Sequence, residues 1–323
     1  MSRVKTVLAV AVTIGLIVGA LYVRSTFIEG DGGGVITDGS TPASGGGGDL
    51  RVACDAMVGT ACPEGAAQLD LDGLLAAFGA ATVEFDMIVA PSVVVEFIEQ
   101  SQTSRARFDP TRDVVATTPL VLAVAVSRDE VMADTCADRV TWSCLAGLVQ
   151  GGQLQPSFGA PQSSSEGLLA VAALTGGFFD DPRFSTNVLG GSGFLGWVDA
   201  LNDQSQFSPT PVQRLIQFNG AQNDSAVAIE AVGYRNVERA AQNRPELFWP
   251  TPLAYVQVVA VAVGGADVGD VQALGREVGE ALAEAGWRGP DGGPVTDGPP
   301  LDLQDDGLPS GGTLFALRER LGS

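Results

Sequence analysis

The residue types in this chain leave few routes to catalysis. There is no histidine, which removes histidine bases, histidine-containing triads and histidine metal ligands. The one lysine, Lys5, precedes an N-terminal apolar run, so a serine–lysine dyad is excluded as well. Two adjacent acid pairs, at 180–181 and 305–306, lie in Gly- and Pro-containing segments where solvated loops are expected. We therefore predict a protein that is not an enzyme, with no catalytic residue and no cofactor.

The four cysteines form two close pairs, Cys54 with Cys62 and Cys136 with Cys144. Neither pair has the two-residue spacing of a zinc knuckle or a thioredoxin-like motif. The spacing favours two local disulfides, which would be structural in an oxidising compartment. A site with four thiolate ligands is the less favoured alternative, and the acidic segments lack EF-hand spacing, so no metal site is predicted.

Hydroxyl side chains recur where apolar, strand-like runs end. Ser92 begins a helical stretch after one run, Thr117 and Thr118 lie between two runs, and Ser163, Ser164 and Ser165 precede another helix. Serines at a helix start most often cap the helix. Hydroxyl and free backbone N–H groups at the carboxyl ends of strands can instead bind a polar ligand. Capping and ligand contact both stay open for these segments.

The elements that must position these residues alternate along the chain. Strands are expected at 50–53, 85–90, 114–116 and 120–126, and helices at 69–78, 93–100, 167–174, 226–242 and 271–285. Strands alternating with helices predict an α/β fold with largely parallel pairing.

The N-terminus predicts a membrane anchor. Residues 6–23 are uncharged, and as a helix they would extend about 27 Å, close to the thickness of the hydrocarbon core. Arg3 and Lys5 precede the run and acids follow it, so its N-terminus is expected inside the cell. A cleaved signal peptide is the main alternative, although no good cleavage site ends the run. Both alternatives place the residues after this run outside the cytoplasm. With a retained anchor, the protein is expected to be a single-pass protein of the cell membrane whose main domain faces the extracellular side.

Composition divides the rest of the chain. After residues 1–24, with the cytoplasmic end and the anchor, residues 25–49 form a Gly/Ser-rich linker that cannot build a core. Residues 50–289 form the body, and 290–323 form a Gly/Pro/Asp-rich tail with a short terminal helix at 313–321. A solvated tail and a helix docked through its apolar face both stay open for this segment. The net charge of −20 argues against a nucleic-acid partner.

Seven segments of the body resemble, in order and spacing, the type II periplasmic solute-binding proteins, especially actinobacterial extracellular domains often fused to von Willebrand A modules. They are 50–53 (LRVA), 85–92 (FDMIVAPS), 117–126 (TTPLVLAVAV), 140–148 (VTWSCLAGL), 158–169 (FGAPQSSSEGLL), 248–259 (FWPTPLAYVQVV) and 281–288 (ALAEAGWR). The resemblance implies two α/β lobes joined by a hinge of two crossing strands. One lobe would contain about 50–120 and 252–289, and the other about 121–251.

Carried over by position, the resemblance implies a ligand cleft between the lobes. It would be lined by Asp55, Ala56, Met57, Ser92, Thr117, Thr118, Ser163, Ser164, Ser165 and Asp224. The implied function is capture of a small polar ligand for transport or sensing, with a membrane transporter or an envelope protein as a further partner. No lipid-accepting cysteine follows the anchor, and no von Willebrand A module is present. A surface module that uses this fold for protein contacts is therefore the alternative.

Overall fold

In the computed structural model, the strands of this chain join into one sheet. The structure describes residues 50–101, 106–136, 139–293, 298–303 and 307–322, which all belong to one compact unit. The strands are β1 (Val52–Asp55), β2 (Ala67–Leu69), β3 (Met87–Pro91), β4 (Asp113–Val124), β5 (Pro156–Phe158), β6 (Gln206–Phe207), β7 (Ser225–Ile229), β8 (Glu246–Phe248) and β9 (Tyr255–Ala262). Their order is β2-β1-β3-β9-β4-β7-β5-β6, with β8 paired to β4.

Helices connect most of these strands, as the α/β pattern predicts. They are α2 (Leu71–Gly79), α3 (Ser92–Gln100), α4 (Asp129–Cys136), α5 (Trp142–Gln150), α6 (Ser165–Phe179), α7 (Ser192–Gln204), α8 (Pro211–Phe218), α9 (Glu230–Arg239), α10 (Val268–Glu284) and α11 (Gly311–Leu321). Short 3-10 helices occupy Ala56–Ala61 (η1), Val126–Arg128 (η2) and Thr186–Val188 (η3). Several helices begin at a side-chain cap: the Asp70 carboxylate, for example, accepts a hydrogen bond from the N–H of Gly73 at the start of α2.

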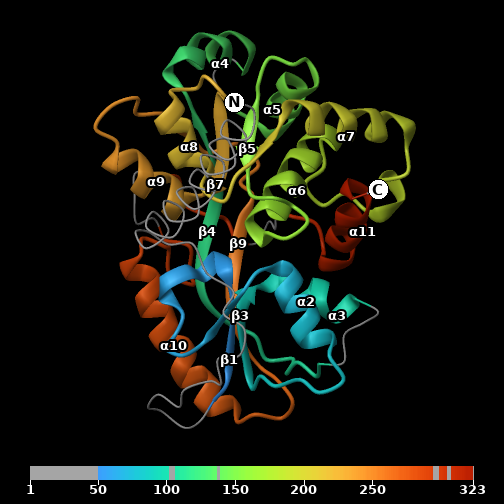
Figure 1. Ribbon diagram of the computed structural model, residues 1–323, viewed down its shortest axis with the longest axis vertical. Helices are drawn as coiled ribbons and strands as arrows, with labels where there is room; N and C mark the ends of the chain where they lie inside the picture. Colours follow the sequence, from blue (N-terminus) through green and yellow to red (C-terminus); the bar gives the residue numbers. More distant parts are fainter. Residues whose placement is uncertain (1–49, 102–105, 137–138, 294–297, 304–306, 323) are drawn as a thin grey trace, which may run out of the picture. The chain divides into compact units, whose positions relative to one another are not determined.

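Strand β4 divides the sheet into two lobes because its two halves have different partners (Figure 1). Residues 113–119 pair with β9, and residues 120–124 pair antiparallel with β7. We call β1, β2, β3, β9, α2, α3, α10 and residues 113–119 lobe 1, and β5–β8, α4–α9 and residues 120–124 lobe 2. Pro119, which has no N–H to donate, lies where β4 changes partners.

Three expectations from the sequence are wrong. Pairing is not largely parallel, because the long strands β4 and β9 pair antiparallel with each other and with their other neighbours, β3, β7 and β8. The helix expected at 226–242 is strand β7 followed by helix α9, because the apolar run at 225–229 is buried between β4 and β5. Periodicity cannot distinguish a fully buried strand from a buried helix. The two strands expected at 114–116 and 120–126 are one continuous strand, β4, which contains Thr117 and Thr118 in its middle.

A buried ion pair joins the lobes beside β4. Arg288, which follows α10 of lobe 1, donates from Nε and Nη2 to the two carboxylate oxygens of Glu230 at 2.6 Å each. Glu230 begins α9 of lobe 2, and it also accepts from the indole of Trp249 at 2.8 Å. Both charged side chains are almost completely buried, and the backbone of Arg288 pairs with that of Thr117 in β4. This paired arrangement satisfies most of the guanidinium donors without water.

The C-terminal helix α11 contacts both lobes. Its Leu314 and Leu317 are fully buried, and Phe315 packs on Phe97 of α3 with ring centroids 5.5 Å apart. Arg318 donates to the Gln162 carbonyl of lobe 2 and forms an ion pair with Asp72 of lobe 1. The C-terminal segment therefore packs against the core.

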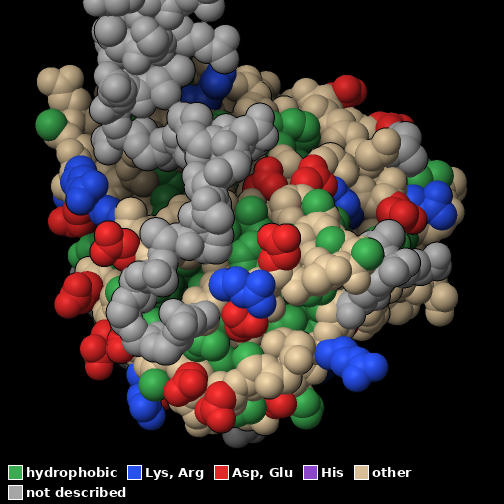
Figure 2. All heavy atoms as spheres, turned by 60° about the horizontal axis from the view of Figure 1, so that its bottom comes forward, with side chains coloured by type: hydrophobic (Ala, Val, Ile, Leu, Met, Phe, Trp, Pro, Cys, Tyr) green, Lys and Arg blue, Asp and Glu red, His purple; other side chains and the backbone are tan. Residues whose placement is uncertain are grey.

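The expected anchor and linker, residues 6–23 and 25–49, lie outside the described residues. Within the described part, no helix combines the length and the apolar character needed to cross a bilayer. Figure 2 shows acidic side chains spread over one face of the molecule, in keeping with the net charge of −20.

Glu230→Leu should lower the free energy of unfolding by about 3–5 kcal/mol, because it leaves the Arg288 charge buried without its partner. The double variant Glu230→Leu/Arg288→Met should recover part of this loss. The control is Glu238→Leu, which breaks the exposed pair with Arg244 and should cost less than about 1 kcal/mol. Urea unfolding measures all three, and equal losses for the two single variants would contradict the assignment.

Candidate functional site

A cavity of about 450 Å³ lies between the lobes, where the end of β1 faces the start of α6. Lobe 1 contributes its wall through residues 55–57 and Asp70. Lobe 2 contributes residues 159–160, 163–166 and 207–209. This volume is in the range of small-molecule sites.

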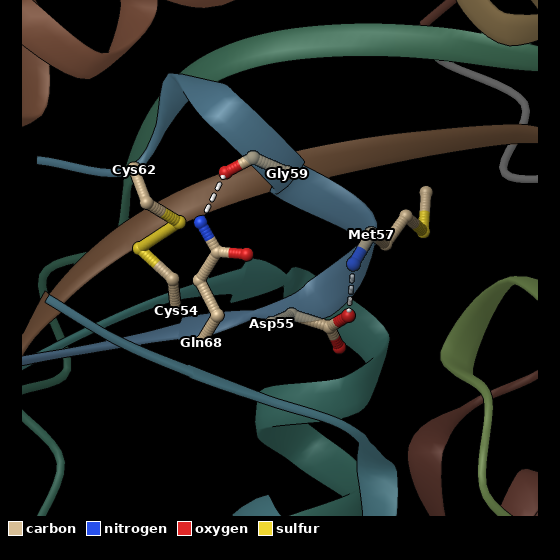
Figure 3. Close-up of a disulfide and its surroundings, with 6 residues drawn as sticks. All are labelled: Cys54, Asp55, Met57, Gly59, Cys62 and Gln68. Atoms are coloured by element: carbon tan, nitrogen blue, oxygen red, sulfur yellow. Dashed lines mark hydrogen bonds between the residues drawn. A yellow bond between two sulfur atoms is a disulfide. The ribbon is translucent and has the colours of Figure 1, made fainter. Parts of the chain in front are cut away.

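The lobe 1 wall is a short turn fixed at both ends (Figure 3). The Asp55 carboxylate accepts from the N–H of Met57 at 2.8 Å, which fixes the start of η1. A disulfide between Cys54 and Cys62 closes the segment, and Gln68 donates to the Gly59 carbonyl at 3.0 Å. The predicted pairing of Cys54 with Cys62 is therefore confirmed.

The second predicted disulfide is also confirmed, and it lies in lobe 2. Cys136 at the end of α4 is bonded to Cys144 in the first turn of α5. The segment between them includes Thr141, whose hydroxyl accepts from the N–H of Cys144 and caps α5. This bridge fixes the approach to α5, and neither of its cysteines lines the cavity.

The lobe 2 wall is the turn into α6. The Ser164 hydroxyl caps this helix, since it accepts from the N–H of Gly167 at 3.1 Å. Glycine is required at 167, because a Cβ there would lie 2.1 Å from the carbonyl oxygen of Gly159. The close approach of the two backbones holds the serine segment against the cavity, so Ser164 is both a cap and a lining residue.

The two walls touch each other. The Ser165 hydroxyl donates to the Asp55 carboxylate with an oxygen–oxygen distance of 2.5 Å, and the Leu71 N–H donates to the Ser163 carbonyl at 3.0 Å. Asp55 and Ser165 are 1% and 3% exposed. The described conformation therefore brings both sides of the cleft into direct hydrogen-bond contact.

Burial changes the acidity of two carboxyl groups here. Burial raises the pKa of Asp55 from 3.8 to about 6, although hydrogen bonds from Ser165 and Met57 oppose the shift. The nearby charge of Asp70 raises it further. Burial likewise raises the pKa of Glu166, against the hydrogen bond it accepts from the Ile229 N–H, and the charge of Asp55 adds to the increase. The site thus concentrates carboxyl groups in a poorly hydrated space.

The predicted site residues separate into groups. Six of them line this cavity together: Asp55, Ala56, Met57, Ser163, Ser164 and Ser165. Ser92 instead lines a second cavity of about 590 Å³, with residues of α3, β9, the 183–185 segment and the C-terminal segment 308–313. The C-terminal segment packs against α3 at this point, so its terminal helix is docked and not solvated.

Thr117, Thr118 and Asp224 require a correction, because all three are buried in the framework. Thr117 and Thr118 lie inside β4, where their hydroxyls donate to backbone carbonyls of Gly289 and Pro119. Asp224 is 3% exposed at the start of β7, where it accepts from the Gln155 N–H and pairs with Arg128. These side chains already have partners within the chain, so they position β4 and lobe 2.

The prediction from the sequence missed seven lining residues: Asp70, Gly159, Ala160, Glu166, Phe207, Ser208 and Pro209. Asp70 and Glu166 each lie at a helix start, where an acidic side chain is expected to cap the helix, so the sequence did not mark them as lining residues. Phe207, which is 50% exposed, follows no recognisable motif. In the described ranges, no group of three or more Asp, Glu, Cys or His side chains is arranged to hold a metal ion.

Comparison with known proteins places this geometry in a fold class. No protein-family model matches the chain, and no curated protein sequence is significantly similar to it. Iron-bound HitA from Pseudomonas aeruginosa superposes with a TM-score of 0.55 at 14% identity, over 84% of this chain and 97% of HitA. The periplasmic binding protein AfuA from Actinobacillus pleuropneumoniae, with exogenous fructose-6-phosphate bound, gives 0.51 at 14%, over 84% and 95%. A periplasmic thiamin-binding protein gives 0.50 at 11%, over 84% and 93%.

At these identities the likeness is one of fold. The chain has the two-lobed α/β architecture of type II periplasmic solute-binding proteins, as the sequence motifs predicted. The structural neighbours are binding proteins and not enzymes.

The shifted pKa of Asp55 predicts how Asp55→Asn changes stability with pH. A carboxyl group with a higher pKa in the folded protein binds its proton more readily there, so its contribution favours folding at low pH and is lost as pH rises through about 6. The shift from 3.8 to about 6 corresponds to about 3 kcal/mol. Wild type loses this contribution as the pH rises, whereas Asn does not titrate, so the stability of Asp55→Asn relative to wild type should increase by up to that amount between pH 4 and pH 7.5.

Chemical unfolding of both proteins across this pH range measures the difference. Asp199→Asn, on the exposed side of α7, is the control with the same change of charge, and as a surface substitution it should change stability by less than about 0.5 kcal/mol. Parallel pH curves for Asp55→Asn and wild type would show that burial does not shift this group.

Proposed function

We propose that this chain is an extracytoplasmic solute-binding protein that captures a small polar solute between its lobes. The cavity where Asp55 of lobe 1 meets Ser165 of lobe 2 carries the proposal. A solute bound there contacts both lobes at once, so its binding energy favours the arrangement in which they are in contact. The type II fold and a set of neighbours that are binding proteins support the same function, without enzymatic activity.

A specific observation favours a second candidate, a module for protein contacts. Helix α11 already links the lobes, through Arg318, Gln162 and Asp72, and the Asp55–Ser165 hydrogen bond adds a link across the cleft. Lobes held together in this way need no solute to stay in contact. Transport or sensing with an envelope partner, and the finer likeness to actinobacterial domains, rest on the sequence motifs alone.

Filling the cavity distinguishes the two candidates. Ala56 is exposed and lines the cavity, so Ala56→Trp should block solute binding with little loss of packing. Small molecules released from the purified full-length protein by acid, identified by mass spectrometry and added back in calorimetry, should bind wild type and not this variant. Ala76→Trp, on the exposed face of α2 and outside the cavity, is the matched control and should bind normally.

Unchanged binding in Ala56→Trp would place the solute elsewhere. If no solute is released and none binds, while a partner protein binds wild type and Ala56→Trp equally, the second candidate is correct.

We also propose that residues 6–23 are a retained anchor, with the N-terminus inside and the lobes outside the cell. The length of the uncharged run and the basic residues Arg3 and Lys5 support this topology. Intact-mass measurement of the protein in the membrane fraction should give a mass that includes this segment. A mature chain that starts after Val23 would show that it is a cleaved signal.

A further inference from the structure

Three carboxylate side chains in the described part of the chain are at least nine-tenths buried, Asp55, Asp224 and Glu230. One of these three lacks a cationic partner. Glu230 is paired with Arg288, and Asp224 with Arg128 at 2.8 Å. Asp55 is bonded only to neutral groups, the Met57 N–H and the Ser165 hydroxyl, and forms no ion pair with a described residue. Burying a carboxylate without a counter-charge is costly, so its position calls for a cation from outside the chain.

The space next to Asp55 is available to such a cation. Asp55 lines the 450 Å³ cavity, and none of the described residues that line it is Lys or Arg. Asp70 and Glu166 add further carboxyl groups to the wall. A carboxylate has about four acceptor positions, and two bonds to Asp55 are accounted for, so it can accept more.

The remainder of the lining suits the carbon skeleton of an organic molecule. The ring of Phe207 is 50% exposed and lines the cavity, with its position supported by Phe158 at a centroid distance of 5.7 Å. Met57 adds a flexible apolar side chain to the opposite wall. Aromatic faces attract ammonium and guanidinium groups as well as alkyl groups. A bare metal ion finds no cluster of three or more ligating side chains in the described residues.

We infer that this cavity binds a small organic cation, with its ammonium or guanidinium group at Asp55 and its alkyl part against Phe207. The inference rests on the proposed solute-binding function and names the class of the solute. The cation takes the position that arginine occupies at the two other buried carboxylates. Ser163 and Ser208 provide neutral polar lining around it.

The test uses the full chain and probes of matched shape. Choline, agmatine and putrescine are the cationic probes, 3,3-dimethyl-1-butanol is the uncharged isostere of choline, and Mg²⁺ and Ca²⁺ test for a metal site. At least one organic cation should raise the melting temperature and bind in calorimetry at pH 7.5. The isostere and the metal ions should bind at least tenfold more weakly than that cation.

Two measurements connect binding to Asp55. Asp55→Asn should weaken binding of the cation at least tenfold without melting earlier than wild type at pH 7.5, because it removes an uncompensated charge. A residue with only a structural role would lower the melting temperature on substitution. Asp199→Asn is the control with the same change of charge and should bind as wild type does.

Binding should also weaken about tenfold between pH 7.5 and pH 5, as Asp55, with a pKa of about 6, becomes protonated. Asp70 and Glu166 are the other titratable groups that face the site. Choline and agmatine keep their charge over this range, so the loss reports on the protein.

The outcomes separate this inference from the proposed function. Equal binding of choline and its uncharged isostere, binding of metal ions alone, or unchanged binding in Asp55→Asn would overturn the assignment of a cation. Binding of anionic or neutral solutes that Ala56→Trp abolishes would overturn it while supporting solute capture. If no solute of any charge binds, both proposals fail.

Discussion

The buried pair of Arg288 and Glu230 is the interaction on which the arrangement around the cleft depends. It joins the end of α10 in lobe 1 to the start of α9 in lobe 2, and the Trp249 indole completes it from the segment that connects β8 to β9. Two charges can be buried at this position because their hydrogen bonds are nearly all made within the chain. The backbone of Arg288 is at the same time paired with Thr117 in the middle of β4. Strand β4, both lobes and the segment that connects β8 to β9 therefore meet at this one buried ion pair.

Comparison with this ion pair shows how Asp55 differs from the two other buried carboxylates. At Arg288 and at Arg128 the chain provides a cation for each buried acid, so these carboxylates stabilise the framework. At the cleft it provides a hydroxyl and an N–H, which hydrogen-bond the carboxylate but do not neutralise it. The raised pKa of Asp55 expresses this difference, because the hydrogen bonds do not offset the loss of hydration. The framework and the proposed binding site therefore differ in how a buried carboxylate is compensated: arginine neutralises it in the framework, and only neutral hydrogen-bond donors contact it at the cavity.

The sequence predicts those features that depend on local signals. Both disulfides follow from short spacing, and the turn at residues 55–57 and the serine segment before α6 meet in one cavity, as the resemblance implied. Ser92 occupies the predicted start of α3 but faces another cavity, because the C-terminal segment lies against that helix. Thr117 and Thr118 are inside a strand because β4 continues past Pro119 and exchanges one partner for another. These differences arise from contacts between segments distant in sequence, which no local pattern records.

Contact between the lobes and the charge of Asp55 are coupled through hydration. Ser165, which lies against the carboxylate, belongs to lobe 2, whereas Asp55 belongs to lobe 1, so part of the burial of Asp55 exists only while the lobes touch. Separation would return water to the carboxylate, and this gain opposes contact whenever the group is charged. Helix α11 and the ion pair of Arg288 with Glu230 favour contact independently of that charge. A cation bound at Asp55 would remove the opposing contribution, so its binding would be linked to contact between the lobes by the electrostatics of a single carboxylate.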